Sequence, residues 1–342
     1  MSKLDGFKHG INLGGWLSQC KPVEEHYSSF IKEKDIQTIA EWGLDHVRLP
    51  VDYELFMNDD GTFKEQGFIH IQNAIDWCRA AGINMILDLH KTPGYSFYSG
   101  ENEEGLFDSE RLQGLFYDIW TEFAKRFGKY EDMLCFELLN EVTEESYSKP
   151  WNRIAGITIE KIREICPTIR ILVGSYWNNH VATVRYLDPP RDENIIYNFH
   201  CYEPLVFTHQ GAHWIPTMDT SFRMNFDATF AEYDENTKAH LVQAGDSFGK
   251  YPADATPDES YFEALFEDAI KVAEERGTEL YCGEYGVIEN ADPEEAMKWF
   301  RVIEAVFEKH GIGRAVWSYK KMNFGVADAR MNGVRDELLK IL

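Results

Sequence analysis

The strongest constraint on the fold is a short apolar run that ends in two polar residues. Leu134 to Val142 reads LCFELLNEV, and such a run is typical of a strand buried on both faces of a sheet. Asn140 and Glu141 follow at its end, where burial costs free energy unless the amide and the carboxyl group have partners or a task. The run therefore predicts a sheet that presents polar side chains at its strand ends.

A second run of the same kind lies far downstream. Leu280 to Gly286 reads LYCGEYG and carries Glu284 near its C-terminal end. Two glutamates on the ends of two strands suggest a pair of carboxyl groups that share one site.

Strands and helices alternate along most of the chain. Besides the run from 134, strands are expected at 10–16, 46–51, 84–90, 169–176, 195–202, 279–285 and 313–319. Apolar residues at helical spacing predict helices at 32–42, 68–81, 110–127, 151–165, 258–275 and 293–309.

About eight strands of this kind predict an α/β fold, a (β/α)8 TIM barrel with 1–342 as a single domain. Near-continuous apolar strands fit an all-parallel sheet. A doubly wound open sheet is the alternative, but no Gly-x-Gly-x-x-Gly motif opens any of the helices. The segment 203–256 has no sustained period and is too long for an ordinary loop, so we interpret it as a small subdomain inserted after the sixth strand.

Charge restricts the partners. The 342 residues carry a formal net charge of -24, which argues against nucleic acid and against an anionic membrane surface, since both would repel the chain. The N-terminal residues lack the apolar region of a secretory signal, and no run approaches a membrane span. We therefore expect a neutral substrate and no export by that route, with the compartment left open. The six cysteines form no Cys-x-x-Cys pair, which indicates free thiols.

In a barrel of this type, the loops after the strands build the site. The chain places a dense set of polar and aromatic residues there: Arg48, His90, Asn140, Glu141, Tyr176, Trp177, His200, Tyr202, Glu284 and Trp317. Each residue alone has a structural explanation, such as a cap, an ion pair or core packing. Together they indicate a function or a complete network, because burying so many polar groups around one mouth is otherwise unfavourable.

The chemistry that fits these residues is cleavage of a glycosidic bond. One carboxyl group must donate a proton to the leaving oxygen, and another must be ionised to attack the anomeric carbon or to activate water. Asn140 is placed to hydrogen-bond a sugar hydroxyl, Arg48 and Tyr202 to keep one carboxylate ionised, and Trp317 to stack on a pyranose face.

The motifs also resemble a known family. The chain is similar to glycoside hydrolase family 5, a family of retaining (β/α)8 glycosidases, and most to its compact bacterial endoglucanases of the clostridial endoglucanase C type. The resemblance covers almost the whole chain and rests on the site residues above and on four segments: Gly10 to Trp16, Tyr197 to His200, Phe207 to Trp214 and Ala315 to Lys321.

The resemblance implies roles for these residues. Glu141 is expected to be the acid/base and Glu284 the nucleophile. The surrounding shell is expected to comprise Arg48, His90, Asn140, His200, Tyr202 and Trp317. The family uses no catalytic metal or other cofactor, and the inserted subdomain is expected to border the cleft. One departure is visible, because Lys91 stands where the family pattern predicts a second histidine after His90.

Two further signals are weighed against this assignment. His209 and His213 have the spacing of two metal ligands on a helical turn, but no helical period surrounds them, and no metal site is expected. Glu137 is a rival carboxylate inside the 134 run. By strand alternation it faces opposite to Asn140, so we expect it to pair with a cation behind the barrel wall.

These observations predict a retaining endo-β-1,4-glucanase of the cellulase or lichenase type. It would act on β-glucan chains as a monomer, through a glycosyl-enzyme at Glu284. A β-mannanase or a xyloglucanase on the same catalytic shell is the alternative within the class. A glucan-binding protein without activity is the alternative from another class, although a pure binder has no need for both Glu141 and Glu284.

Overall fold

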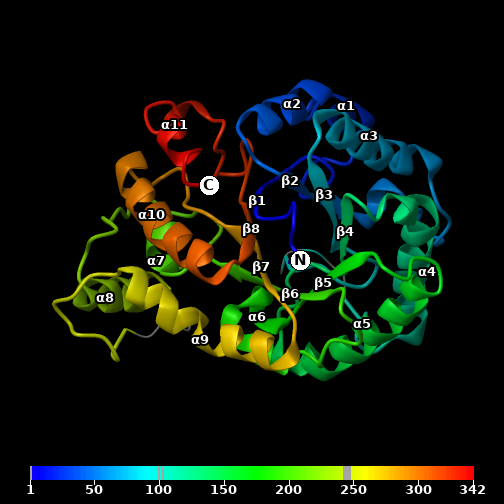
Figure 1. The fold of residues 1–342 in the computed structure, drawn as a ribbon. Coiled ribbons are helices and arrows are strands. Elements are labelled where there is room, and N and C mark those ends of the chain that lie inside the picture. The colour runs from blue at the N-terminus through cyan, green and yellow to red at the C-terminus, as the bar shows by residue number, and fades with distance from the viewer. Residues whose placement is uncertain (1, 99–100, 102–103, 242–247) are drawn as a thin grey trace.

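Eight parallel strands form a closed barrel in chain order (Figure 1), in a computed structural model that describes residues 2–98, 101, 104–241 and 248–342. The strands are β1 His9–Asn12, β2 His46–Asp52, β3 Asn84–Lys91, β4 Leu134–Glu137, β5 Arg170–Gly174, β6 Ile195–Cys201, β7 Leu280–Tyr285 and β8 Gly313–Val316. β1 pairs in parallel with both β2 and β8, which closes the ring. The predicted (β/α)8 barrel is confirmed.

Helices surround the barrel in Figure 1. The α-helices are α1 Glu24–Ser29, α2 Glu33–Glu41, α3 Glu65–Ala81, α4 Glu110–Phe127, α5 Ser148–Arg163, α6 Tyr176–Asn179, α7 Leu205–Thr208, α8 Phe230–His240, α9 Glu259–Arg276, α10 Pro293–His310 and α11 Arg335–Leu338. The 3-10 helices are η1 Tyr53–Leu55, η2 Gly128–Tyr130, η3 Glu145–Tyr147, η4 Val181–Tyr186 and η5 Ala329–Met331. Between β5 and β6, only the short α6 and η4 take the place of a long helix.

Several strands end earlier than the apolar pattern predicts. β1 ends at Asn12, β5 at Gly174 and β8 at Val316. The residues that follow leave the ladder as loops, and these loops carry the glycines and aromatic residues that the sequence placed in the strands. The residues at these strand ends therefore lie outside the regular sheet, where their side chains can form a site.

Two apolar layers support the site. One cluster fills the barrel below it and joins Leu4 and Phe7 of the N-terminal segment to strand residues such as Ile86, Leu172 and Tyr281. The other lies between the strands and the helices and includes fully buried Trp120 on α4. Burial of one large apolar side chain contributes roughly 1.5 to 3 kcal/mol. The two clusters therefore hold the strands, and the side chains at their ends, in fixed positions.

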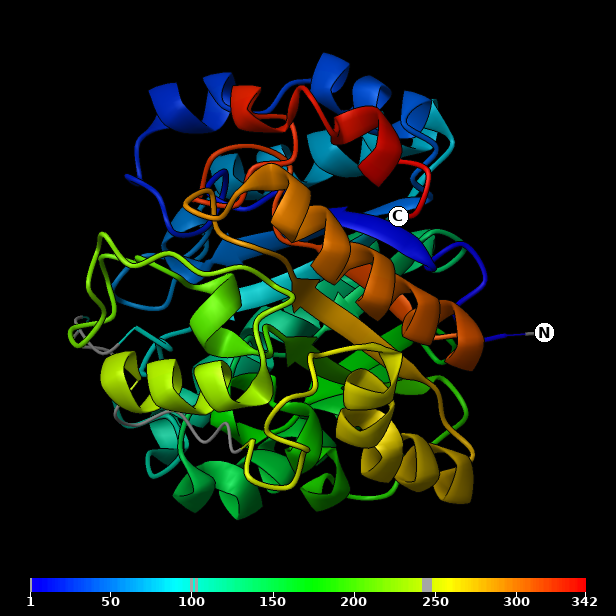
Figure 2. The same cartoon turned by 90° about the vertical axis from the view of Figure 1, so that its left-hand side faces the viewer.

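The segment between β6 and α9 contains two helices that the sequence pattern did not reveal, α7 and α8. Thr229 begins α8 with a capping box, in which its side chain accepts from the Glu232 backbone and Glu232 accepts from the Thr229 backbone. Figure 2 shows α8 on the side of the barrel toward which β7 points, opposite the N-terminus. Residues 242–247 of the expected insertion lie outside the described residues.

All six cysteines are free, and five of them are buried. None of the helices in the described part of the chain has the length and apolar character needed to cross a bilayer.

Candidate active site

The barrel brings the eight predicted site residues to one end. Arg48 lies on β2, His90 on β3, His200 on β6 and Glu284 on β7. The other four follow strand ends and are Asn140, Glu141, Tyr202 and Trp317. Hydrogen bonds and ring contacts join them in three groups: Arg48 with Asn140, Glu284 and Tyr202; Glu141 with His200; and His90 with Trp317.

Arg48 is the centre of this network. Its guanidinium has five N–H groups, and all five have acceptors. Nε and Nη2 donate to the two oxygens of Glu137 at 2.7 and 2.8 Å, and Nη1 donates to Glu284 Oε1 at 2.8 Å. The two remaining N–H groups donate to the side-chain oxygens of Asn12 and Asn140. One arginine on β2 therefore fixes groups on β1, β4 and β7 and directly after β4.

The position predicted for Glu137 is wrong. It pairs with a cation as expected, but that cation is Arg48, inside the barrel, and Asn198 of β6 donates to the same carboxylate at 2.8 Å. The alternation argument fails because β4 ends at Glu137, so the residues between Glu137 and Asn140 do not keep a strand period. Glu137 acts as a structural counter-charge for the arginine.

Glu284 has the environment of an ionised carboxylate. Arg48 holds Oε1, and the Tyr202 hydroxyl donates to Oε2 at 3.0 Å. Burial raises the pKa of Glu284, and the nearby Glu141 adds to this, while Arg48 acts in the opposite direction. A full positive charge and a hydroxyl donor both favour the charged form.

Glu141 has neutral partners instead. Asn178 Nδ2 donates to Oε2 at 3.1 Å, and His200 Nδ1 lies 2.8 Å from Oε1. Burial raises the pKa of Glu141, opposed first by the Asn178 hydrogen bond. With no cation bonded to it, Glu141 is the carboxyl group of the pair that keeps its proton more readily.

The backbone around Glu141 is strained. Glu141 has a φ of 42°, and Trp177, Asn178 and Asn179 have φ values of 57, 55 and 56°. Three consecutive residues in the left-handed region are costly unless the surroundings hold them, and such strain concentrates at functional sites. Here it directs the Asn178 amide at Glu141, and it leaves the Trp177 ring exposed.

Both site histidines are neutral. Burial lowers the pKa of His90 and of His200 to about 4. Asn179 Nδ2 lies 3.4 Å from His200 Nε2, and His200 Nδ1 faces Glu141. His90 Nδ1 is held by Asp88 at 2.7 Å.

Several buried atoms at this end have no hydrogen-bond partner among the described residues, Asp88 Oδ1 and Asn179 Oδ1 among them. Two more are Asn140 Nδ2, a donor, and His90 Nε2, an acceptor in the neutral ring. Unpaired buried polar atoms are costly, and a ligand hydroxyl can satisfy either. The ring of His90 stacks on Trp317 at 6.0 Å with 6° between the planes. A Cβ at Gly14 would lie 2.8 Å from Trp317, so the glycine after β1 allows this indole its position.

Sequence reasoning missed four residues of the network: Asn12, Asp88, Asn178 and Asn198. Asp88 and Asn198 each stand two positions before a predicted site histidine, and residues two apart on a strand share a face. That spacing was a signal for both. Asn178 follows a strand end in a Trp-Asn-Asn sequence, and asparagine is enriched in the left-handed region.

One group in the described part of the chain has the geometry to hold a metal ion. Ligand atoms of Glu141, His200 and Glu284 all lie within 4.8 Å of one another. Arg48 occupies one oxygen of Glu284 and opposes a further cation. The pair His209 and His213 does not form such a group among the described residues: His209 is half-buried with its ring against Tyr202, whereas His213 is exposed.

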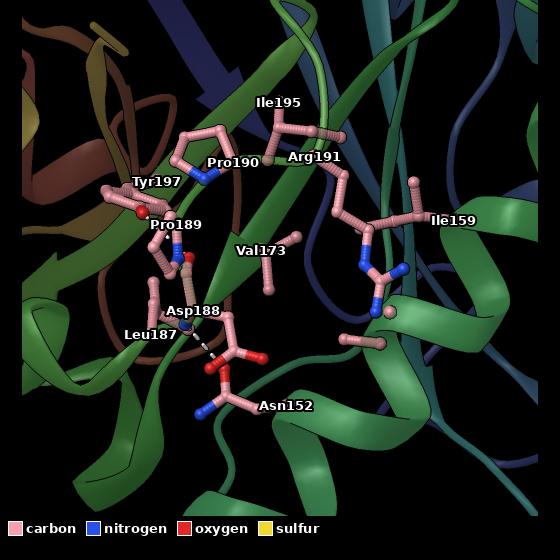
Figure 3. Close-up of a pocket in the computed structure, with 12 residues that line it drawn as sticks. Asn152, Ile159, Val173, Leu187, Asp188, Pro189, Pro190, Arg191, Ile195 and Tyr197 are labelled. Atoms are coloured by element: carbon pink, nitrogen blue, oxygen red, sulfur yellow. Dashed lines mark hydrogen bonds between the residues drawn. The ribbon is translucent and has the colours of Figure 1, made fainter. Parts of the chain in front are cut away.

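A separate small cavity lies on the outside of the barrel (Figure 3). It measures about 30 Å³ and lies between α5, β5, β6 and the segment 187–191. Asn152 accepts from the Asp188 backbone at its edge. Its volume is about that of one water molecule, and it lies away from the carboxyl pair.

Known proteins resemble this chain in sequence. The model of a family described as Cellulase (glycosyl hydrolase family 5) matches residues 8–323. Cellodextrinase A of Ruminococcus flavefaciens is 47% identical over 314 residues, which cover 92% of this chain and 86% of that protein. Endoglucanase C of Acetivibrio thermocellus is 38% identical over 340 residues, which cover 98% of each.

Solved structures resemble it in fold. The clostridial cellulose synthase subunit Z of Clostridioides difficile has a TM-score of 0.77 and 26% identity, with 98% of this chain and 99% of that chain covered. The endoglucanase Cel5A of Thermotoga maritima has a TM-score of 0.77 and 23% identity, with 100% of both chains covered. The second likeness concerns the fold alone.

Proposed function

This chain belongs to glycosyl hydrolase family 5, as the motifs indicated, and from that premise we propose that it is a retaining endo-β-1,4-glucanase. Glu141 is the acid/base and Glu284 the nucleophile. The observation that carries the proposal is the approach of the two carboxyl groups, which have oxygens within 4.8 Å of each other. Retaining enzymes place the groups about 5 to 5.5 Å apart, whereas inverting enzymes need about 6.5 Å or more.

The first step forms a bond between Glu284 and the sugar. A carboxylate oxygen of Glu284 attacks the anomeric carbon, the glycosidic C–O bond breaks, and the Glu141 proton passes to the leaving oxygen. Arg48 and Tyr202 keep Glu284 ionised through their hydrogen bonds. Asn140 Nδ2 and His90 Nε2, which have no partner in the described part of the chain, bind hydroxyl groups of the reacting sugar.

The second step releases that sugar. A water molecule attacks the anomeric carbon, its proton passes to the carboxylate of Glu141, and the bond to Glu284 breaks. His200 and Asn178 hold Glu141 in place in both of its protonation states. Two inversions at one carbon give net retention.

The substrate is a β-1,4-glucan chain. The relatives that cover nearly all of this chain are a cellodextrinase and an endoglucanase, and the net charge of -24 fits a neutral polysaccharide. We further propose that the chain acts as a monomer, with 1–342 as one catalytic domain. Size-exclusion chromatography with light scattering tests the monomer.

The inserted segment 203–256 is proposed to border the cleft. Within it, His209 meets the ring of Tyr202 at 5.0 Å and the exposed Trp214 at 5.9 Å. Tyr202 in turn holds Glu284. These contacts support a position of the segment beside the nucleophile.

The test is release of reducing ends from four polysaccharides in parallel: mixed-linkage β-glucan, carboxymethylcellulose, galactomannan and xyloglucan. Glu284→Gln is the matched control, because it keeps the side-chain shape and removes the nucleophile. We expect fast release from the first two substrates and loss of several orders of magnitude in the variant. Release of reducing ends from galactomannan or xyloglucan alone would overturn the assignment of a β-1,4-glucan substrate. Release from none of the four would favour a glucan-binding protein without activity.

A further inference from the structure

His180 and Glu203 form a buried contact at the same end of the barrel, and the mechanism described above uses neither. His180 follows the left-handed segment 177–179, and Glu203 follows β6, directly after Tyr202. His180 Nε2 lies 2.8 Å from Glu203 Oε1, and only 20% and 10% of the two side chains are exposed. The contact fastens the loop after β5 to the end of β6.

The hydrogen bonds of His180 fix where its ring proton lies. The backbone N–H of Ala182 donates to Nδ1 at 3.1 Å, so Nδ1 offers its lone pair and carries no proton. In a neutral imidazole the other nitrogen is then the donor, and Nε2–H is donated to Glu203. Burial raises the pKa of Glu203, but the contact with His180 and weaker contacts outweigh burial and hold that pKa below its ordinary value. A neutral donor therefore meets an ionised acceptor, and such a bond is stronger than one between neutral groups.

Glu203 is a firm support for this bond. Its backbone carbonyl accepts the indole N–H of Trp299 at 2.9 Å, and Trp299 is fully buried on α10. The preceding residue, Tyr202, is held by its own hydrogen bond to Glu284. The backbone of His180 is also bridged to that of His200 on β6. The two side chains therefore join a loop to a part of the chain that is already fixed.

The His180 side chain also supports the strained segment before it. Its ring stacks on the Trp177 indole, with 4.8 Å between the centroids and 29° between the planes. On the other side of the segment, the backbone N–H groups of Trp177 and Asn178 donate to the carbonyls of the two residues that follow Glu141. A residue with a side chain adopts a left-handed conformation at a cost, so three in succession need contacts on both sides. His180 supplies contacts on the β6 side.

The direction of the Asn178 amide depends on this support. Asn178 is the middle residue of the segment, and its Nδ2 donates to Glu141 Oε2 at 3.1 Å from a backbone with a φ of 55°. A return of the segment to ordinary backbone angles would turn the amide away. Glu141 would then lose a donor and the fixed orientation that proton transfer requires.

We propose that His180 and Glu203 are positioning residues for Glu141. Their hydrogen bond holds the left-handed segment so that Asn178 donates to Glu141. It thereby supports transfer of the Glu141 proton to the leaving oxygen in the first step and removal of a proton from water in the second. This inference rests on the proposed function, in which Glu141 is the acid/base.

The test compares two aryl β-cellobiosides with different leaving groups. The 2,4-dinitrophenolate ion leaves without a proton, whereas phenolate needs the proton of the acid/base. In His180→Ala, kcat/KM for phenyl β-cellobioside should fall by about 10- to 100-fold, which is part of what general acid catalysis contributes. For the dinitrophenyl substrate, kcat/KM should stay the same, while kcat should fall because the second step still needs Glu141 as a base.

Two further variants separate positioning from folding, which calorimetry checks for each protein. His180→Gln keeps a side-chain N–H for Glu203 and should recover most of the lost rate on phenyl β-cellobioside. Glu203→Gln keeps the shape and offers a weaker acceptor, so it should show the same pattern with a smaller fall, and it carries the comparison if His180→Ala does not fold. His310→Ala is the matched control, because His310 meets Glu263 at 3.0 Å in a pair of the same kind between α10 and α9. It should change neither rate.

Three results would overturn the inference. An equal fall in kcat/KM on both substrates would show a general structural effect. Unchanged rates in His180→Ala and Glu203→Gln would show that the pair does not position Glu141. A rate of His180→Gln as low as that of His180→Ala would show that the bond to Glu203 is not the cause.

Failure of the proposed function has a different signature. The unaltered protein would release no product from either cellobioside or from mixed-linkage β-glucan, or Glu141→Ala would lower kcat/KM equally on both cellobiosides. Either result would reject the glucanase function or the acid/base role of Glu141, and the inference with it. The three results above concern His180 and Glu203 alone, since they are read in a protein whose Glu141→Ala variant shows the dependence on the leaving group.

Discussion

Removal of the Tyr202 hydroxyl should move the acidic limb of the pH–rate profile. The hydroxyl donates to Glu284 Oε2 at 3.0 Å inside a buried site, and a hydrogen bond to a charged group contributes about 1.5 to 3 kcal/mol. The bond favours the ionised form, so its loss in Tyr202→Phe raises the pKa of Glu284. Since about 1.36 kcal/mol corresponds to one pKa unit, the limb should move upward by about 1 to 2 units.

The assay is kcat/KM for p-nitrophenyl β-cellobioside as a function of pH, because this parameter reports the ionisation of the free enzyme. At a pH below the new midpoint, the rate should fall by about 10- to 100-fold and should recover at higher pH. Tyr233→Phe is the control, since it loses a buried hydroxyl that donates to the Phe226 carbonyl on the inserted segment. An acidic limb that stays in place, or moves down, would refute the assignment of Glu284 as the ionised carboxylate.

Three further perturbations test other parts of the site. Asn178→Gly removes the donor to Glu141 and tolerates the left-handed backbone, so the basic limb of the same profile should move up by about one unit. Gly14→Ala places a Cβ 2.8 Å from Trp317; kcat/KM should fall about tenfold or more through misplacement of the ring, with little change in melting temperature by calorimetry. Burial raises the pKa of Asp52 to about 8 and of Asp88 and Glu304 to about 7. These groups therefore keep protons that the unfolded chain has lost, and the melting temperature should fall as pH rises from about 4, near the unfolded pKa values, to about 8. That fall should be smaller in Asp52→Asn, and a melting temperature that rises across this range would contradict the burial argument.

The fold was predictable because each long apolar run is buried on both faces and the helices between them are amphipathic. The prediction of helices was weakest where the apolar residues have no regular spacing in the sequence. α8 was missed because it begins with a local capping box at Thr229 rather than with an apolar stripe. The connection between β5 and β6 holds only α6 and η4, which are too short to leave a period in the sequence.

The arrangement of the candidate site was predictable where a polar residue lies next to the last residue of a strand. His90, His200 and Glu284 follow this rule, and the barrel brings strand ends together whatever their separation in sequence. The network beneath them was harder to predict, because a partner such as Glu137 is chosen by packing across the barrel. Asn178 depends on three consecutive left-handed residues, and such a conformation is imposed by the surrounding structure rather than by local preference.

All five N–H groups of Arg48 have acceptors, and this bears on which parts of the protein can be replaced. Every N–H of the guanidinium is used by groups on β1, β4 and β7 or directly after β4. These groups are therefore held together without hydrogen bonds from Arg48 to the loops that follow β1, β2 and β3. The loops after β1, β2 and β3 can be exchanged for others, in the laboratory or in descent, while the chemistry beneath them stays the same.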